Sequence, residues 1–95
     1  MAVAFLIEIP GMTAEQGAAV LRELGVTNDK TVPGQLAHIE GPMEGGFRVV
    51  DVWESQEVFD AFVGSQLAPA FQRVGLTLPP DMRPTLAWQV TGILK

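Results

Sequence analysis

Residues 45–62 constrain the fold more than any other part of the chain, because one continuous run encodes a turn, a strand, a helix cap and a helix. Gly45-Gly46 suits a tight turn, and residues 47–54 are an apolar segment typical of a buried strand. Ser55 then has the side chain of a helix N-cap, and Val58 begins a series of apolar residues at helical spacing. A strand that leads directly into an amphipathic helix predicts a domain built from both kinds of element.

A strand and a helix precede this run. Residues 2–9 are apolar and alternating, and Pro10-Gly11 ends them, which predicts a mostly buried first strand. Residues 13–16, Thr-Ala-Glu-Gln, match a capping box. We therefore expect a helix from Thr13 to about Leu24, with Gly25 as the residue that terminates it.

Two more strands complete the pattern. Residues 35–41 form the second strand, and residues 41–46 are short enough to be a hairpin loop, so the second and third strands are expected to be antiparallel. The helix that follows Ser55 continues to about Val74, and Pro69 should kink it or mark a new start. Residues 85–94 form the last strand.

The resulting order, β-α-β-β-α-β, predicts a single ferredoxin-like α+β domain over residues 1–95, a four-stranded antiparallel sheet with two helices on one face. The other face of the sheet is left uncovered. Hydrophobic residues make up 47% of the chain, which is more than so small a monomer buries easily. We therefore expect two sheets to pack face to face in a homodimer, forming a dimeric α/β barrel.

Composition excludes several classes of function. The net charge of −5 and the lack of a Lys/Arg cluster predict no nucleic-acid partner and no anionic membrane surface. The chain has no cysteine and a single histidine, so we expect neither a disulfide nor a metal site. The first residues lack the pattern of a signal peptide or a membrane span, and we expect a cytoplasmic protein.

These features resemble the dimeric α/β-barrel superfamily, in particular the small proteins grouped with the antibiotic-biosynthesis monooxygenases. The resemblance rests on residues 37–42, Ala-His-Ile-Glu-Gly-Pro, and on residues 50–55, Val-Asp-Val-Trp-Glu-Ser, followed by Phe59 and Phe62. The superfamily includes cofactor-independent quinone-forming monooxygenases, haem-degrading monooxygenases, isomerases and many small proteins without known activity. The haem-degrading branch requires a tryptophan and an axial histidine where this chain has Phe62 and Gln72, so we expect no haem and no other cofactor.

The resemblance also implies a ligand pocket between the sheet and the helices. Similar short members often carry a bulky aromatic residue at the position of Gly17, so the glycine predicts open space there. The pocket would hold an apolar, flat aromatic or polyketide-like small molecule, and the residues expected to line it are Phe5, Gly17, Trp53, Phe62 and Trp88.

His38 is the natural candidate for proton transfer, because its unperturbed pKa lies near neutrality. Asp51, an acid in an apolar strand, is the second candidate. A structural strand histidine, and an ion pair between Asp51 and Arg48, Arg73 or Arg83, are the competing interpretations. The hairpin register sets the face that His38 takes, and the sequence leaves it open. His38 lies with Val50 and Val52 in one register, and with Val49 and Asp51 after a slip of one residue.

Two functions therefore remain open from the sequence. One is a cofactor-independent monooxygenase or isomerase that uses His38 and Asp51 on a flat aromatic molecule. The other is a non-catalytic homodimer of the same fold that binds a small molecule or has only a structural role.

Overall fold

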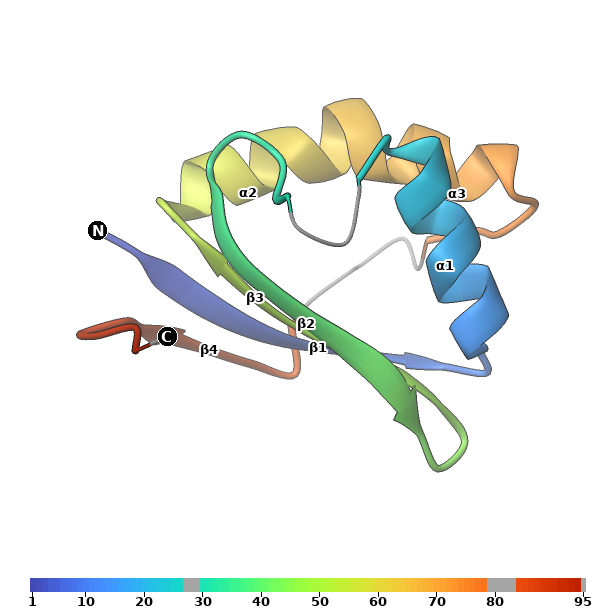
Figure 1. The fold of residues 1–95 in the computed structure, drawn as a ribbon, viewed down its shortest axis with the longest axis horizontal. Helices are drawn as coiled ribbons and strands as arrows, with labels where there is room; N and C mark the ends of the chain where they lie inside the picture. Colours follow the sequence, from blue (N-terminus) through green and yellow to red (C-terminus); the bar gives the residue numbers. More distant parts are fainter. Residues whose placement is uncertain (27–29, 79–83, 95) are drawn as a thin grey trace.

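The computed structural model describes residues 1–26, 30–78 and 84–94 of the 95-residue chain. Its elements are the strand β1 (Val3–Pro10), the helix α1 (Ala14–Glu23), the strands β2 (Gln35–Met43) and β3 (Gly46–Trp53), the helix α2 (Gln56–Phe62), a π-helical turn η1 (Val63–Leu67), the helix α3 (Ala68–Arg73) and the strand β4 (Leu86–Gln89). The strands form one antiparallel sheet in the order β2-β3-β1-β4. The helices lie on one face of that sheet (Figure 1), which is the ferredoxin-like α+β arrangement expected from the sequence.

Local sequence signals set the helix boundaries. Thr13 and Gln16 form the predicted capping box at the start of α1, and Ser55 accepts a hydrogen bond from the backbone N–H of Val58 at the start of α2. Gly25 follows α1 with φ of 73°, the left-handed conformation that suits a glycine after a helix.

The second helix is continuous but changes its winding before Pro69. A proline has no N–H to donate to the preceding turn, and here the turn before it widens to the π form, with the Ala68 N–H donating to the carbonyl of Val63. Pro69 then occupies the first turn of α3. Of the two expected outcomes, a kink or a new start, the structure shows a change of winding with Pro69 in the first turn of α3, and the helix runs on without a gap.

Two strands differ in length from the prediction. The hairpin between β2 and β3 closes in a two-residue turn at Glu44 and Gly45, so β2 continues through Pro42 to Met43. An edge strand accommodates the proline, because its missing N–H costs no ladder bond when it points away from the neighbour. β4 spans only Leu86–Gln89, where residues 85–94 were expected, and the Val90 N–H makes one more bond, to the carbonyl of Ala2.

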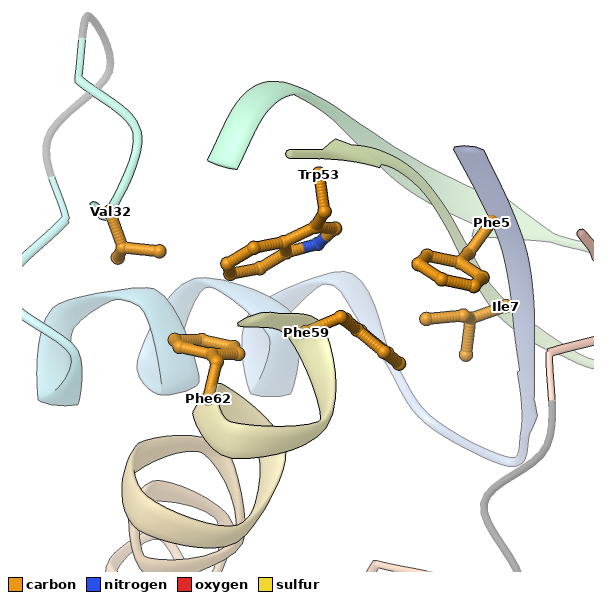
Figure 2. Close-up of a cluster of buried hydrophobic side chains, with 6 residues drawn as sticks. All are labelled: Phe5, Ile7, Val32, Trp53, Phe59 and Phe62. Atoms are coloured by element: carbon orange, nitrogen blue, oxygen red, sulfur yellow. The ribbon is translucent and has the colours of Figure 1, made fainter. Parts of the chain in front are cut away.

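Aromatic side chains fill the space between the sheet and α2. The Phe5 and Phe59 rings are stacked at 4.4 Å between centroids, and Trp53 lies 4.9 Å from Phe62. Figure 2 shows Trp53 projecting from β3 toward these phenylalanines, with Val32, from the loop before β2, on its other side. A second buried cluster joins α1 to α3 and consists of Met12, Val20, Phe47, Ala70 and Phe71.

The opposite face of the sheet is apolar and open to solvent. Cross-strand partners share a face, and the register places Ile39, Val50, Leu6 and Leu86 in one row across all four strands. Ile39 is 69% exposed and Leu86 58% exposed. No described segment of this chain covers that face (Figure 1), so a large apolar surface has no partner within the described part of the molecule.

Candidate functional site

The hairpin register places His38 opposite Asp51 on the side of the sheet that faces the helices. His38 pairs with Asp51, and Asp51 in turn pairs with Phe5 of β1. Of the two registers open from the sequence, this is the one that joins His38 to Asp51 rather than to Val50 and Val52. The two candidate residues for proton transfer are therefore direct neighbours.

Asp51 is buried and has three hydrogen-bond donors. Its Oδ1 accepts from Nδ1 of His38 at 2.5 Å and from Nε2 of Gln35 at 3.0 Å, while Oδ2 accepts from the indole nitrogen of Trp53 at 3.2 Å. The side chain is 7% exposed. A buried carboxylate is stable only when such donors replace its hydration.

Within the chain, neither of the two arginines that the structure describes forms the ion pair with Asp51 that was the competing interpretation. Arg48 lies opposite Gly41 and Glu8, a register position on the other face of the sheet from Asp51. Arg73 binds Glu23 at 2.7 Å. The third candidate, Arg83, lies outside the described residues. His38 takes the place of the arginine because the register brings its ring directly across the ladder.

His38 bridges two carboxylates. Besides its bond to Asp51, its Nε2 donates to Oε1 of Glu40 at 2.7 Å. Burial disfavours the charged ring, but the hydrogen bonds to Asp51 and Glu40 and their negative charges outweigh it and raise the pKa of His38 to about 9. At pH 7 the ring therefore carries a proton on both nitrogens, and only about 1% of molecules hold a neutral His38.

This triad of Glu40, His38 and Asp51 forms one wall of a cavity of about 630 Å³. Residues of the strands β1, β2 and β3 line the cavity. Residues of α1, of the segment 30–32, and of α2, η1 and α3 also line it. Most of its lining is apolar, including Ile7, Met12, Val20, Val49, Phe62 and Phe71. A mostly apolar pocket with a few convergent polar groups is the usual form of a small-molecule site.

The structure places the five expected pocket residues in three different settings. Gly17 and Phe62 line the cavity. Phe5 and Trp53 are buried in the core beneath it, and Trp53 contributes through its hydrogen bond to Asp51. Trp88 pairs with Ala4, on the opposite face from Phe5, and is 48% exposed there.

The space at Gly17 is partly filled by the protein itself. A Cβ atom at this position would lie 2.5 Å from Cζ of Phe47, whose ring is buried against the helix backbone. The glycine therefore permits close packing of α1 on β3. Gly17 and Phe47 still line the cavity beside this contact. The partner ring lies thirty residues further along the chain, and no local pattern in the sequence pointed to it.

Sequence reasoning also missed two polar members of the wall. Glu40 follows His38 by two residues on a strand, so the alternation of side chains already placed both on one face. Gln35 donates to Asp51, and its Oε1 accepts from the backbone N–H of Val32, so it ties the loop before β2 to the triad. A bulge between Gln35 and Ala37 shifts the register there, and nothing in the sequence marks that bulge.

Other kinds of site are not seen in the described residues. No group of three or more His, Asp or Glu side chains among them is arranged to hold a metal ion. Nor is any helix in that part of the chain long and apolar enough to cross a membrane.

The fold is that of a known protein with little sequence in common. The crystal structure of a putative antibiotic biosynthesis monooxygenase from Chloroflexus aurantiacus J-10-fl superposes with a TM-score of 0.59 at 14% identity, covering 100% of this chain and 96% of that one. No family model and no curated protein matches the sequence. This structural likeness supports the fold that the resemblance in residues 37–42 and 50–55 implied, which is that of the antibiotic-biosynthesis monooxygenases.

Proposed function

We propose that this chain is a cofactor-independent monooxygenase or isomerase that binds a flat aromatic or polyketide-like molecule in the cavity beside His38. The observation that carries the proposal is the Glu40–His38–Asp51 triad on the wall of an otherwise apolar cavity. An apolar site accepts a ring system, and the triad offers that ring system a place to lose a proton. The fold likeness is consistent with this chemistry but does not by itself assign it.

The reaction we envisage begins with loss of a proton from an acidic hydroxyl or an activated CH₂ group of the substrate. His38 accepts it in the small fraction of molecules whose ring is neutral, and Asp51 then stabilises the imidazolium that forms. In an oxygenation, the substrate anion gives electrons to O₂, and a CH₂ group becomes a carbonyl while the second oxygen atom leaves as water. In an isomerisation, the same proton returns at another carbon.

A homodimer is part of the proposal. The apolar rows on the outer face of the sheet have no cover in the described chain, and pairing two such faces would bury them on both sides. Trp88, Ile39 and Leu86 would then lie in the dimer interface rather than at a ligand.

A non-catalytic binding protein is the second candidate, and one observation favours it. Both nitrogens of His38 already donate to carboxylates, so at neutral pH the ring has no lone pair for a substrate proton. In this alternative the triad is a structural element that closes one end of a ligand pocket.

Oxygen consumption with 1,8-dihydroxyanthrone, a flat tricyclic compound with an activated CH₂ group, distinguishes the two. The enzyme proposal expects uptake above the protein-free rate that increases toward pH 9, and a loss of roughly 10²–10⁴ in His38→Gln. The control is Asp60→Asn, an exposed position on α2 that does not line the cavity. Binding without uptake supports the second candidate, and the absence of both contradicts the proposal.

A further inference from the structure

Besides His38, one arginine and one lysine line the cavity. Arg22 is in the last turn of α1, and Lys30 lies in the segment before β2. The chain has an acidic balance, with a net charge of −5. The other two arginine or lysine side chains of the described residues, Arg48 and Arg73, do not line the cavity. Basic side chains are thus concentrated at the cavity of an otherwise acidic protein.

These two cations have no carboxylate partner among the described residues. The ion pairs there join His38 to Glu40, His38 to Asp51, and Arg73 to Glu23. Two positive side chains at the border of a cavity, with no carboxylate partner in the part of the chain that the structure describes, raise the local concentration of anions and favour a negatively charged ligand group.

The acidic and the basic residues that line the cavity come from different elements of the fold. The acidic residues Glu40 and Asp51 come from β2 and β3, whereas Arg22 comes from α1 and Lys30 from residues 30–34 before β2. The rest of the lining is mostly apolar and includes Val20, Phe47 and Phe71. A ligand that satisfies the whole lining is therefore a flat apolar body with an anionic group on the helix side and a neutral hydroxyl or keto group at the triad.

We infer that the ligand of this cavity is an aromatic carboxylic acid whose carboxylate is held by Arg22 and Lys30. This rests on the proposed use of the cavity and narrows its substrate class. A cationic ligand would meet repulsion from Arg22 and Lys30, and a neutral one would form no ion pair with them. Arginine and lysine donate charge-assisted hydrogen bonds to a carboxylate, which are stronger than bonds between neutral groups.

The test compares two fluorescent probes of nearly equal shape, anthracene-2-carboxylate and anthracene-2-carboxamide, by anisotropy titration at low salt. The inference predicts that the wild-type protein binds the carboxylate about tenfold more tightly than the carboxamide. Arg22→Gln and Lys30→Gln should each weaken carboxylate binding several-fold, and the double variant should remove the preference. Carboxamide binding should stay unchanged. Both residues are exposed, so the fold should be retained, and circular dichroism checks this.

Arg73→Gln is the matched control, because it removes the same charge at a position away from the cavity. Equal binding of the two probes by the wild-type protein would overturn the inference and leave the proposed function standing, and so would a carboxylate preference that survives the double variant. Equal weakening by Arg73→Gln would assign the preference to overall charge and also overturn it. If neither probe binds, the inference and the proposed use of the cavity both fail.

Discussion

Replacing Asp51 with asparagine should remove much of the dependence of stability on pH between about pH 6.5 and 9. Asparagine keeps the size of the side chain and loses its charge, so one of the two carboxylates that hold the His38 proton is gone while Glu40 remains. The exposed Asp60→Asn is the matched control, because it makes the same chemical change away from the triad.

The magnitude follows from the pKa of His38, raised from 6.5 to about 9. Without any solvent screening, a rise in pKa of this size corresponds to about 3.4 kcal/mol of stabilisation. The ring is 21% exposed, and solvent screening reduces the effect, so we expect about 2 kcal/mol. Because the folded state holds the proton more tightly than the unfolded chain, this stability is fully present below pH 6.5 and is lost as the pH rises through 9.

Urea unfolding followed by circular dichroism at pH 6, 7.5 and 9.5, at one protein concentration, measures the free energy of unfolding directly. The wild type should lose about 2 kcal/mol over this range, and Asp51→Asn should lose less than half of that. Subtracting the two curves cancels the other titrating groups. Parallel curves for the wild type and Asp51→Asn would show that Asp51 does not hold the proton on His38, and the reasoning would fail.

Three further predictions concern the packing and the outer face. Gly17→Phe should unfold the protein or destabilise it by more than about 2 kcal/mol, since its Cβ would collide with the Phe47 ring, and the added Phe47→Ala change should recover part of the loss in a thermal melt. An unchanged melting temperature in Gly17→Phe would disprove that contact. Ser55→Ala should cost about 1 kcal/mol in urea unfolding through loss of the α2 cap, and no change would mean that solvent replaces it. Ile39→Lys should convert a dimer of about 20 kDa to a species near 10.2 kDa in light scattering, whereas a wild-type monomer would refute the dimer itself.

The elements of the fold could be predicted because their signals are local. The capping box at Thr13, the cap at Ser55 and the change of winding before Pro69 each act within about one turn of helix, and all three appear in the structure. The ends of β2 and β4 were placed less well. Strand ends depend on neighbouring strands as well as on their own residues.

The sequence could name only candidate residues for the site, because the geometry of the site depends on contacts between residues that are distant in the sequence. Whether His38 meets Asp51 or Val50 depends on a one-residue register, which the two-residue turn at Glu44 and Gly45 fixes. A six-residue loop was expected there, so the register stayed open. The bulge that brings Gln35 to Asp51 had no signal in the sequence.

Binding of a flat aromatic molecule in the cavity beside the triad can be tested by ¹H–¹⁵N NMR, because only three side chains give histidine-ring or indole signals. The chain has one histidine and two tryptophans, and the three side chains report on different places. His38 lines the cavity, the Trp53 indole donates to Asp51 behind it, and Trp88 lies on the opposite face of the sheet.

The measurement is a titration with 1,8-dihydroxyanthraquinone, a flat tricyclic compound that is stable in air. Binding in the cavity should give saturable shifts of the His38 ring and Trp53 indole signals and leave the Trp88 indole signal unchanged. Shifts confined to Trp88, or no saturable shift at His38 and Trp53, would contradict it.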